Sequence, residues 1–286
     1  MVALPAGNWP TVLDFLCERL NTVTRQTWAD RITSGQVLQE DGHPVLHEQT
    51  YASGQRLYYY RSMPVEPDLP EHETILFEDD HLLVADKPHF MPVTPSGKYV
   101  QQSLLVRLKR QTGCADLSPI HRIDRETAGL VLLSKRPQDR NAYQALFRDR
   151  VVHKSYEAVA AHPTGTALPL VHRSRLEEDK QFFRMREVAG EANSETHVRL
   201  LREAGGHALY ELTPVTGKRH QLRVHMLSLG TPIEGDQFYP EVLRGPNVEE
   251  DFRQPLQLLA RSIAFTDPVT GQSRRFSSGR SLRIQP

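Results

Sequence analysis

The stretch PIHRIDRETAGLVLLSK, residues 119–135, places five charged or titratable side chains directly before an apolar run. The run, residues 130–133, has the composition of a buried strand. Burying an unpaired charge is costly, so charged groups that lead into such a strand must have a use. These groups are His121, Arg122, Asp124, Arg125 and Glu126.

Charge is unevenly distributed along the 286 residues, although the formal net charge is zero. Residues 101–156 hold eleven Lys or Arg and five Asp or Glu, a net charge of +6, whereas residues 1–66 have a net charge of −2. A neutral average therefore does not exclude a nucleic-acid-binding surface in the basic segment, which contains the opening stretch.

The cysteines and the apolar runs indicate the compartment. Cys17 and Cys114 are far apart and match no metal-ligand spacing, and two lone thiols are typical of a reducing compartment. The N-terminus lacks a signal-peptide pattern, and no apolar run approaches membrane-spanning length. We expect a cytoplasmic protein without a membrane segment or a metal site.

The first 66 residues predict a small helix-helix-strand domain. Apolar residues recur at helical spacing from Val12 to Leu20, a second short helix fits residues 28–32, and short strands broken by turns follow to residue 61. Residues 62–73, SMPVEPDLPEHE, contain three prolines and several acids, which favours a linker.

Residues 67–286 predict a second domain of the α/β (α+β) class. Short segments of alternating or flanking apolar residues indicate a mixed, largely antiparallel sheet. One well-formed helix is predicted at residues 137–150. The predicted strands are residues 74–79, 81–87, 129–135, 155–162, 195–204 and 208–215.

Two further polar constellations accompany the opening stretch: HKSY, residues 153–156, and TGKRHQLRVH, residues 216–225, which opens a predicted helix. Asp124 itself lies between two arginines. Guanidinium groups favour the charged form of a carboxylate and lower its pKa, which suits a nucleophile or base that must be ionised at neutral pH. A structural Arg–Asp pair is the alternative for this residue taken alone.

Several readings of single motifs fail. The protein-kinase catalytic loop is excluded because Ile123 interrupts its pattern and no Gly-rich phosphate loop is present. His220 and His225 are five residues apart, which does not match a helical zinc-binding pair. Asp124 and Glu126 could form the carboxylate pair of a glycosidase, but residues two apart in an extended stretch bracket a bond poorly.

The order of the motifs is more specific than any one of them. HRIDRETAGLVLLSK, KSY and TGKRHQLRVH, followed by LGTPIEGDQFY and preceded by ILFEDDHLLVADKPHFMPV, closely resemble the motif series of the RluA-type pseudouridine synthases across residues 74–275. Residues 1–66 resemble, more loosely, the S-four-like RNA-binding module found in front of such domains. Because this module is acidic here, we interpret it as a degenerate copy.

The resemblance implies a monomeric, cofactor-free isomerase that acts on ribosomal or transfer RNA. Such an enzyme detaches uracil from its ribose, rotates the base and reattaches it through carbon 5. Asp124 is similar to the essential aspartate, and Arg223 to the arginine that pairs with it, preferably in bidentate geometry. Tyr156 matches the tyrosine that packs on the base, and Arg122 the residue that fills the space the base leaves. Other expected RNA- or substrate-binding residues are His121, Thr127, Lys218, His220, Gln221 and Leu222.

Two other functions stay open from the sequence: a catalytically inactive RNA-binding or assembly protein of the same fold, and an N-glycoside hydrolase. Asp124, Tyr156 and Arg223 together favour the synthase over the binding protein, since a binding protein would not need a carboxylate facing polyanionic RNA. The basic segment further predicts phosphate contacts at Lys109, Arg110 and Arg125.

Overall fold

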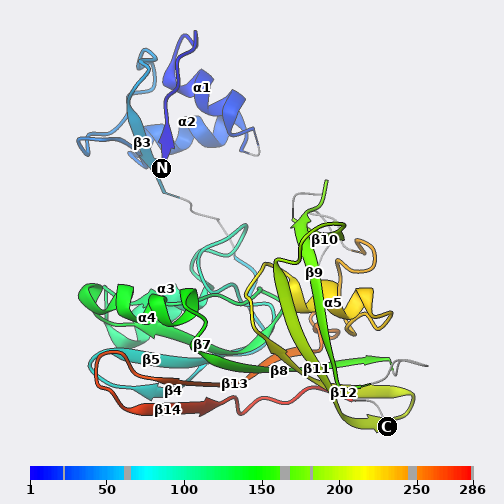
Figure 1. Ribbon diagram of the computed structural model, residues 1–286. Helices are drawn as coiled ribbons and strands as arrows, with labels where there is room; N and C mark the ends of the chain where they lie inside the picture. The colour runs from blue at the N-terminus through cyan, green and yellow to red at the C-terminus, as the bar shows by residue number, and fades with distance from the viewer. Residues whose placement is uncertain (22, 61–65, 162–167, 181–182, 244–249, 285–286) are drawn as a thin grey trace. The chain divides into compact units, whose positions relative to one another are not determined.

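The computed structural model describes residues 1–21, 23–60, 66–161, 168–180, 183–243 and 250–284 (Figure 1). The chain divides into two compact units, Met1–Pro64 and Val65–Pro286. Part of the predicted linker, residues 62–65, lies outside the described residues. The rest of it belongs to the second unit, where the Glu66 carboxylate accepts the backbone N–H groups of Val100, Gln101 and Gln102.

The first unit contains the predicted two helices and short strands. Thr11 and Asp14 form a reciprocal capping box that starts α1, and the buried side chains of Leu16, Trp28 and Leu57 join both helices to the sheet. The strands are antiparallel in the order β1-β3-β2. The elements are β1 (Val2–Ala3), α1 (Val12–Arg19), α2 (Arg25–Thr33), β2 (Val37–Gln39) and β3 (Arg56–Tyr59).

The second unit is built on an 11-stranded sheet. The sequence predicts its mixed, largely antiparallel character and six of its strands. The main path runs β10-β9-β11-β12-β8-β13-β7-β5-β4, with β14 paired to β13 and β6 to β7. Its strands are β4 (Thr74–Glu78), β5 (Leu82–Lys87), β6 (Ser118–Pro119), β7 (Ala128–Ser134), β8 (His153–Ala161), β9 (Leu170–Glu178), β10 (Met185–Val188), β11 (Ser194–Ala204), β12 (His207–Pro214), β13 (Leu258–Thr266) and β14 (Ser273–Ser277).

One parallel pairing joins the two halves of this sheet. Among the described strands the pairings are antiparallel except that of β7 with β13. Ala260 of β13 pairs with Gly129 on one side and with Tyr156 of β8 on the other. Gly129 has a φ of +110°, and a Cβ there would lie 2.3 Å from the carbonyl oxygen of Ala260. Only glycine therefore allows this close approach, which brings the loop before β7 next to Tyr156.

The described part of the second unit contains three α-helices. Figure 1 shows α3 and α4 over one half of the sheet and α5 against the other half. They are α3 (Leu104–Thr112), α4 (Arg140–Arg148), which follows a short 3₁₀ turn, and α5 (Gln221–Ser228). The sequence analysis predicts α4 and α5 but misses α3. The signals for α3 are Leu104 and Leu108, buried at helical spacing, and Gly113 in the left-handed conformation after its last turn. In the described chain, no helix has the length and apolar character needed to cross a bilayer.

Candidate active site

A cleft of about 1060 Å³ opens in the second unit where the loop before β7, the start of β8 and the start of α5 meet. A smaller cavity of about 100 Å³ adjoins it, and Asp124 and Tyr156 line both. Among the described residues, Asp124 is the one carboxylate in the lining of the cleft. The cations that line it are Arg122, Arg125, Arg148, Arg150, Lys154, Lys218 and Arg219.

Asp124 and Arg223, which are 99 positions apart in the sequence, meet at the base of this cleft. Arg223 Nη1 donates to Asp124 Oδ2 at 3.3 Å, and the Asp124 side chain is 25% exposed. Burial alone would raise the pKa of the Asp124 carboxyl, but the charges of His220, Arg223 and Lys87 outweigh it and hold that pKa below its usual value. Asp124 is therefore a carboxylate at neutral pH.

The bidentate partner of Arg223 is Asp236 rather than Asp124, which differs from the expected geometry. Arg223 Nε and Nη2 donate to the two carboxylate oxygens of Asp236 at 2.7 and 2.6 Å. Both side chains are 1% exposed, and the guanidinium also lies over the rings of Phe238 and Tyr239. The edge of the guanidinium that carries Nε and Nη2 is thus held by Asp236, and Nη1 is left to donate to Asp124.

Lys87, at the end of β5, holds the loop that carries Asp124. Its Nζ donates to the backbone carbonyls of Pro88 and Arg125 at 2.9 and 3.0 Å, and the side chain is fully buried. Burial lowers the pKa of Lys87 to about 7, although the nearby charges of Glu126 and Asp124 oppose this shift. The sequence analysis assigns no role to Lys87; the available signal is a lysine that closes the apolar strand LLVADK.

Tyr156 and Arg122 both face the open space beside Asp124. Burial and the charge of Asp124 raise the pKa of the Tyr156 hydroxyl above its usual value, so this group stays protonated and can donate a hydrogen bond. Arg122 is exposed, lines both cavities and has no acidic partner among the described residues. Thr127 and Lys218 also line the smaller cavity.

His121 and Gln221 have structural hydrogen bonds that account for their side chains. His121 Nε2 accepts the backbone N–H of Leu132 at 3.1 Å, and its ring stacks on Phe147. Burial lowers the pKa of His121 to about 3, so it is neutral. The Gln221 side chain donates to the Glu195 carbonyl and the Thr196 hydroxyl and accepts from Thr216 and from the Lys218 backbone. Both residues still line a cavity, as does Leu222, which belongs to the apolar core beneath it.

His220 stands at the start of α5 in the left-handed conformation, with a φ of 52°. Its Nδ1 lies 2.9 Å from the Tyr239 hydroxyl, and its Nε2 lies 3.9 Å from Asp124 Oδ2. This backbone conformation is strained for a residue with a side chain, and here it turns the imidazole toward the carboxylate.

Glu126 and Arg125, which flank this site in sequence, face one another. Arg125 bonds to Glu126 at 2.9 Å and to Glu250, and its guanidinium lies over Tyr99. Glu126 is buried and lines neither cavity, so it does not form a carboxylate pair with Asp124 across the cleft. Arg125 bonds to Glu126 and Glu250, and Lys109 and Arg110 lie outside the cleft lining, so the phosphate contacts expected from these three residues stay predictions.

His172, Glu187 and His225 form a cluster whose ligand atoms lie within 4.8 Å of one another. Ser194 Oγ, which donates to the Ser174 carbonyl, lies 3.0 Å from His225 Nε2, and His172 Nε2 lies 2.7 Å from Glu187 Oε1. The side chains of this cluster therefore have hydrogen-bond partners within the protein.

Comparisons with known proteins agree with this arrangement. A family model described as RNA pseudouridylate synthase matches residues 81–228. Ribosomal large subunit pseudouridine synthase D of Xanthomonas campestris is 31% identical over 87% of this chain and 73% of its own length. Dual-specificity RNA pseudouridine synthase RluA of Haemophilus influenzae is 30% identical over 74% of this chain and 95% of its own. The solved structure of human RNA Pseudouridylate Synthase Domain Containing 4 has a TM-score of 0.57 and 27% identity, covering 73% of this chain and 88% of that one.

Proposed function

Because the chain belongs to the RluA-type RNA pseudouridine synthases, we propose that it isomerises specific uridines in ribosomal or transfer RNA with Asp124 as the essential carboxylate and without a cofactor. The observation that carries this proposal is the chemical contrast inside the cleft. One ionised carboxylate stands among cations that suit a polyanionic strand, and a tyrosine stands beside it.

Each step of the proposed reaction uses side chains that line the smaller cavity. A uridine leaves its stack and enters the smaller cavity, where the ring of Tyr156 packs on the base. Asp124 either attacks the sugar or removes a proton from it, so that the bond from the ribose to the uracil nitrogen breaks. The base rotates within the cavity, and the ribose carbon bonds to carbon 5 in place of the nitrogen; carbon 5 then loses its proton to solvent and the released ring nitrogen takes one up. Arg223 orients Asp124 and keeps it ionised before the reaction starts.

Arg122 is proposed to occupy the space that the flipped base leaves in the RNA. Its exposed position beside Asp124 and its lack of an acidic partner among the described residues support this role. A planar guanidinium can stack between the neighbouring bases and still contact a phosphate. Thr127, Lys218 and His220 border the same space and are proposed to contact the substrate, as are His121, Gln221 and Leu222 through the walls they form.

The test is to map pseudouridines in cellular RNA from a strain with the gene, a strain without it and a strain that carries Asp124→Asn. We expect specific sites to lose pseudouridine in the second and third strains. An inactive assembly protein would leave every site modified in both. An N-glycoside hydrolase would instead produce abasic sites in RNA treated with the purified protein, because water rather than carbon 5 would capture the sugar.

A further inference from the structure

Helix α4 ends in a turn whose left-handed residue is Arg150, with a φ of 59°. The Arg150 N–H donates to the Phe147 carbonyl at 3.3 Å and the Val151 N–H to the Leu146 carbonyl at 3.0 Å, which are the two hydrogen bonds of a Schellman motif. Glycine is the usual residue at this position because it has no Cβ. An arginine there costs stability, and the turn itself does not explain it.

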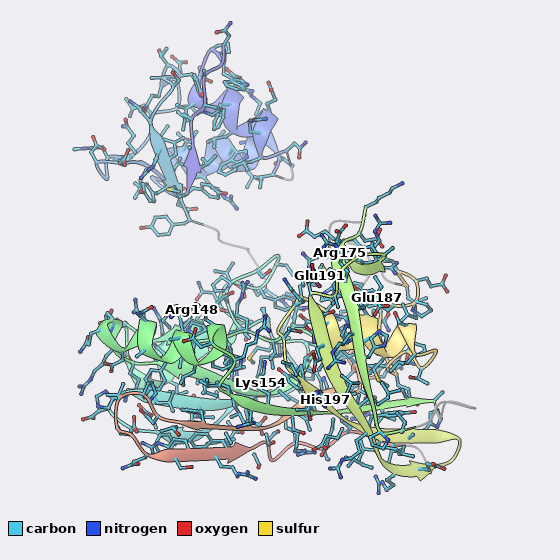
Figure 2. All side chains as sticks on the ribbon, viewed as in Figure 1. Arg148, Lys154, Arg175, Glu187, Glu191 and His197 are labelled. Carbon is cyan, nitrogen blue, oxygen red and sulfur yellow. The ribbon has the colours of Figure 1, made fainter. Side chains whose placement is uncertain are left out.

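The side chain of Arg150 lines the cleft and is exposed. Lys154, four residues later on β8, lines both the cleft and the smaller cavity (Figure 2). Neither side chain has an acidic partner among the described residues. Burial and the nearby charge of Arg150 lower the pKa of Lys154, so the two like charges oppose each other in the cleft. A bound anion would remove this repulsion.

The helix itself does not account for Arg150. A cation near a helix C-terminus interacts favourably with the helix dipole, but Arg148 already occupies the last turn of α4. In the part of the chain that the structure describes, the Arg150 guanidinium donates to no carbonyl of α4. Its charge is therefore available to a ligand in the cleft.

We propose that Arg150 and Lys154 form a phosphodiester-binding subsite for the RNA strand next to the target uridine, an inference that rests on the proposed function. Lys154 and Tyr156 are two residues apart on β8 and so project from the same face of the strand. A phosphate bound at Lys154 therefore belongs to a nucleotide that flanks the base packed on Tyr156. Arg150 adds a planar pair of donors that matches phosphate oxygens.

The experiment uses the full-length protein and four variants: Arg150→Gly, Arg150→Gln, Lys154→Gln and Arg275→Gln. The first two remove the same charge, but only glycine relieves the positive φ. Arg275 is an exposed arginine of β14 that lies outside the cleft lining and serves as the matched control. The readouts are the Tm and the Kd for a synthetic RNA stem-loop with a uridine-rich loop, measured over a range of salt concentrations.

Both Arg150 variants should bind the stem-loop about threefold to tenfold more weakly at low salt, and the slope of log Kd against log salt should become shallower by about 0.7–0.9. Arg150→Gly should have a higher Tm than Arg150→Gln and at least that of the wild type. Lys154→Gln should produce a similar loss of slope. Arg275→Gln should bind RNA as the wild type does.

Arg150 variants that bind RNA as tightly as Arg275→Gln would overturn the subsite and leave the proposed function intact. A lower Tm for Arg150→Gly than for the wild type would show that the Arg150 side chain stabilises the turn. The positive φ of Arg150 would then not point to a role in binding. Salt-independent or absent RNA binding by the wild type would overturn both proposals together.

Discussion

The basic residues of the second unit fall into two groups with different surroundings. Outside the cleft, four cations of the segment 101–156 pair with acidic side chains: Arg107 with Glu73, Lys135 with Glu78, Arg136 with Asp80 and Arg140 with Asp116. Of the cations that line the cleft, four have no acidic partner among the described residues: Arg122, Arg150, Lys154 and Lys218. Net charge along the sequence therefore does not by itself identify a phosphate-binding surface, because a cation paired with a carboxylate must exchange that partner for a phosphate.

The largest expected effect comes from the carboxylate that stands among the cleft cations. Asp124→Asn keeps the shape of the side chain and removes its charge, so turnover should fall by on the order of 10³-fold or more while RNA binding is kept. Tritium release from 5-tritiated uridine RNA measures the first effect and filter binding the second. Substantial activity in a contamination-free Asp124→Asn preparation would refute the assignment.

Arg223→Lys tests whether the several donors of a guanidinium group are needed beneath the cleft. One ammonium cannot hold both oxygens of Asp236 and still reach Asp124, so we expect a rate loss of about 10–100-fold with little change in RNA affinity. Single-turnover kinetics at saturating enzyme separate the two quantities. Near-normal turnover would mean that the contact between Arg223 and Asp124 does not matter for the chemistry.

Asp236→Asn tests the same buried ion pair, between Arg223 and Asp236, by changing its acidic member. Arg223 would keep its charge but lose its bidentate carboxylate, which should destabilise the second unit by about 3 kcal/mol and slow turnover as the guanidinium moves away from Asp124. Urea unfolding followed by near-UV circular dichroism measures the loss. Asp251→Asn, which breaks an exposed pair with Arg253, is the control and should leave the stability nearly unchanged.

A smaller but more specific effect, on the salt dependence of RNA binding, is expected when cleft cations without an acidic partner are replaced. The double variant Arg122→Gln, Lys218→Gln should reduce the salt slope of RNA binding by up to about one log–log unit for each phosphate contact. The matched double variant Lys135→Gln, Arg136→Gln removes the same charge from side chains paired with acids, and should leave the slope nearly unchanged. Equal effects of the two variants would show that net charge alone governs binding.

The smallest effect is expected from the acidic first unit. Removing residues 1–66 should leave the salt slope unchanged and cost at most severalfold in affinity, because this segment has a net charge of −2. Circular dichroism must first show that the remaining chain is folded. A clearly flatter slope for the truncated protein would mean that phosphates contact the first unit after all.

By itself the sequence determined the features that depend on local order. Alternating and continuous apolar runs predict six strands of the second unit, including β5 and β7, and the helical spacing of apolar residues from Val12 to Leu20 predicts α1. The order of the motifs identifies the family and singles out Asp124, Tyr156 and Arg223, which the structure brings to one cleft. The apolar pattern does not predict helix α3, because among its largely basic and polar residues only Leu104 and Leu108 are buried.

Only the tertiary structure decided which charged groups face each other. The fork between Arg223 and Asp236, the burial of Lys87 under the Asp124 loop, and the pairing of Arg125 with Glu250 across 125 positions follow no local pattern. The physical reason is that the interaction between two charges depends on their distance and on the water that burial removes from around them. Both quantities are set by how β7, β8 and α5 meet around Gly129 and Ala260, and no segment of the sequence contains that information alone.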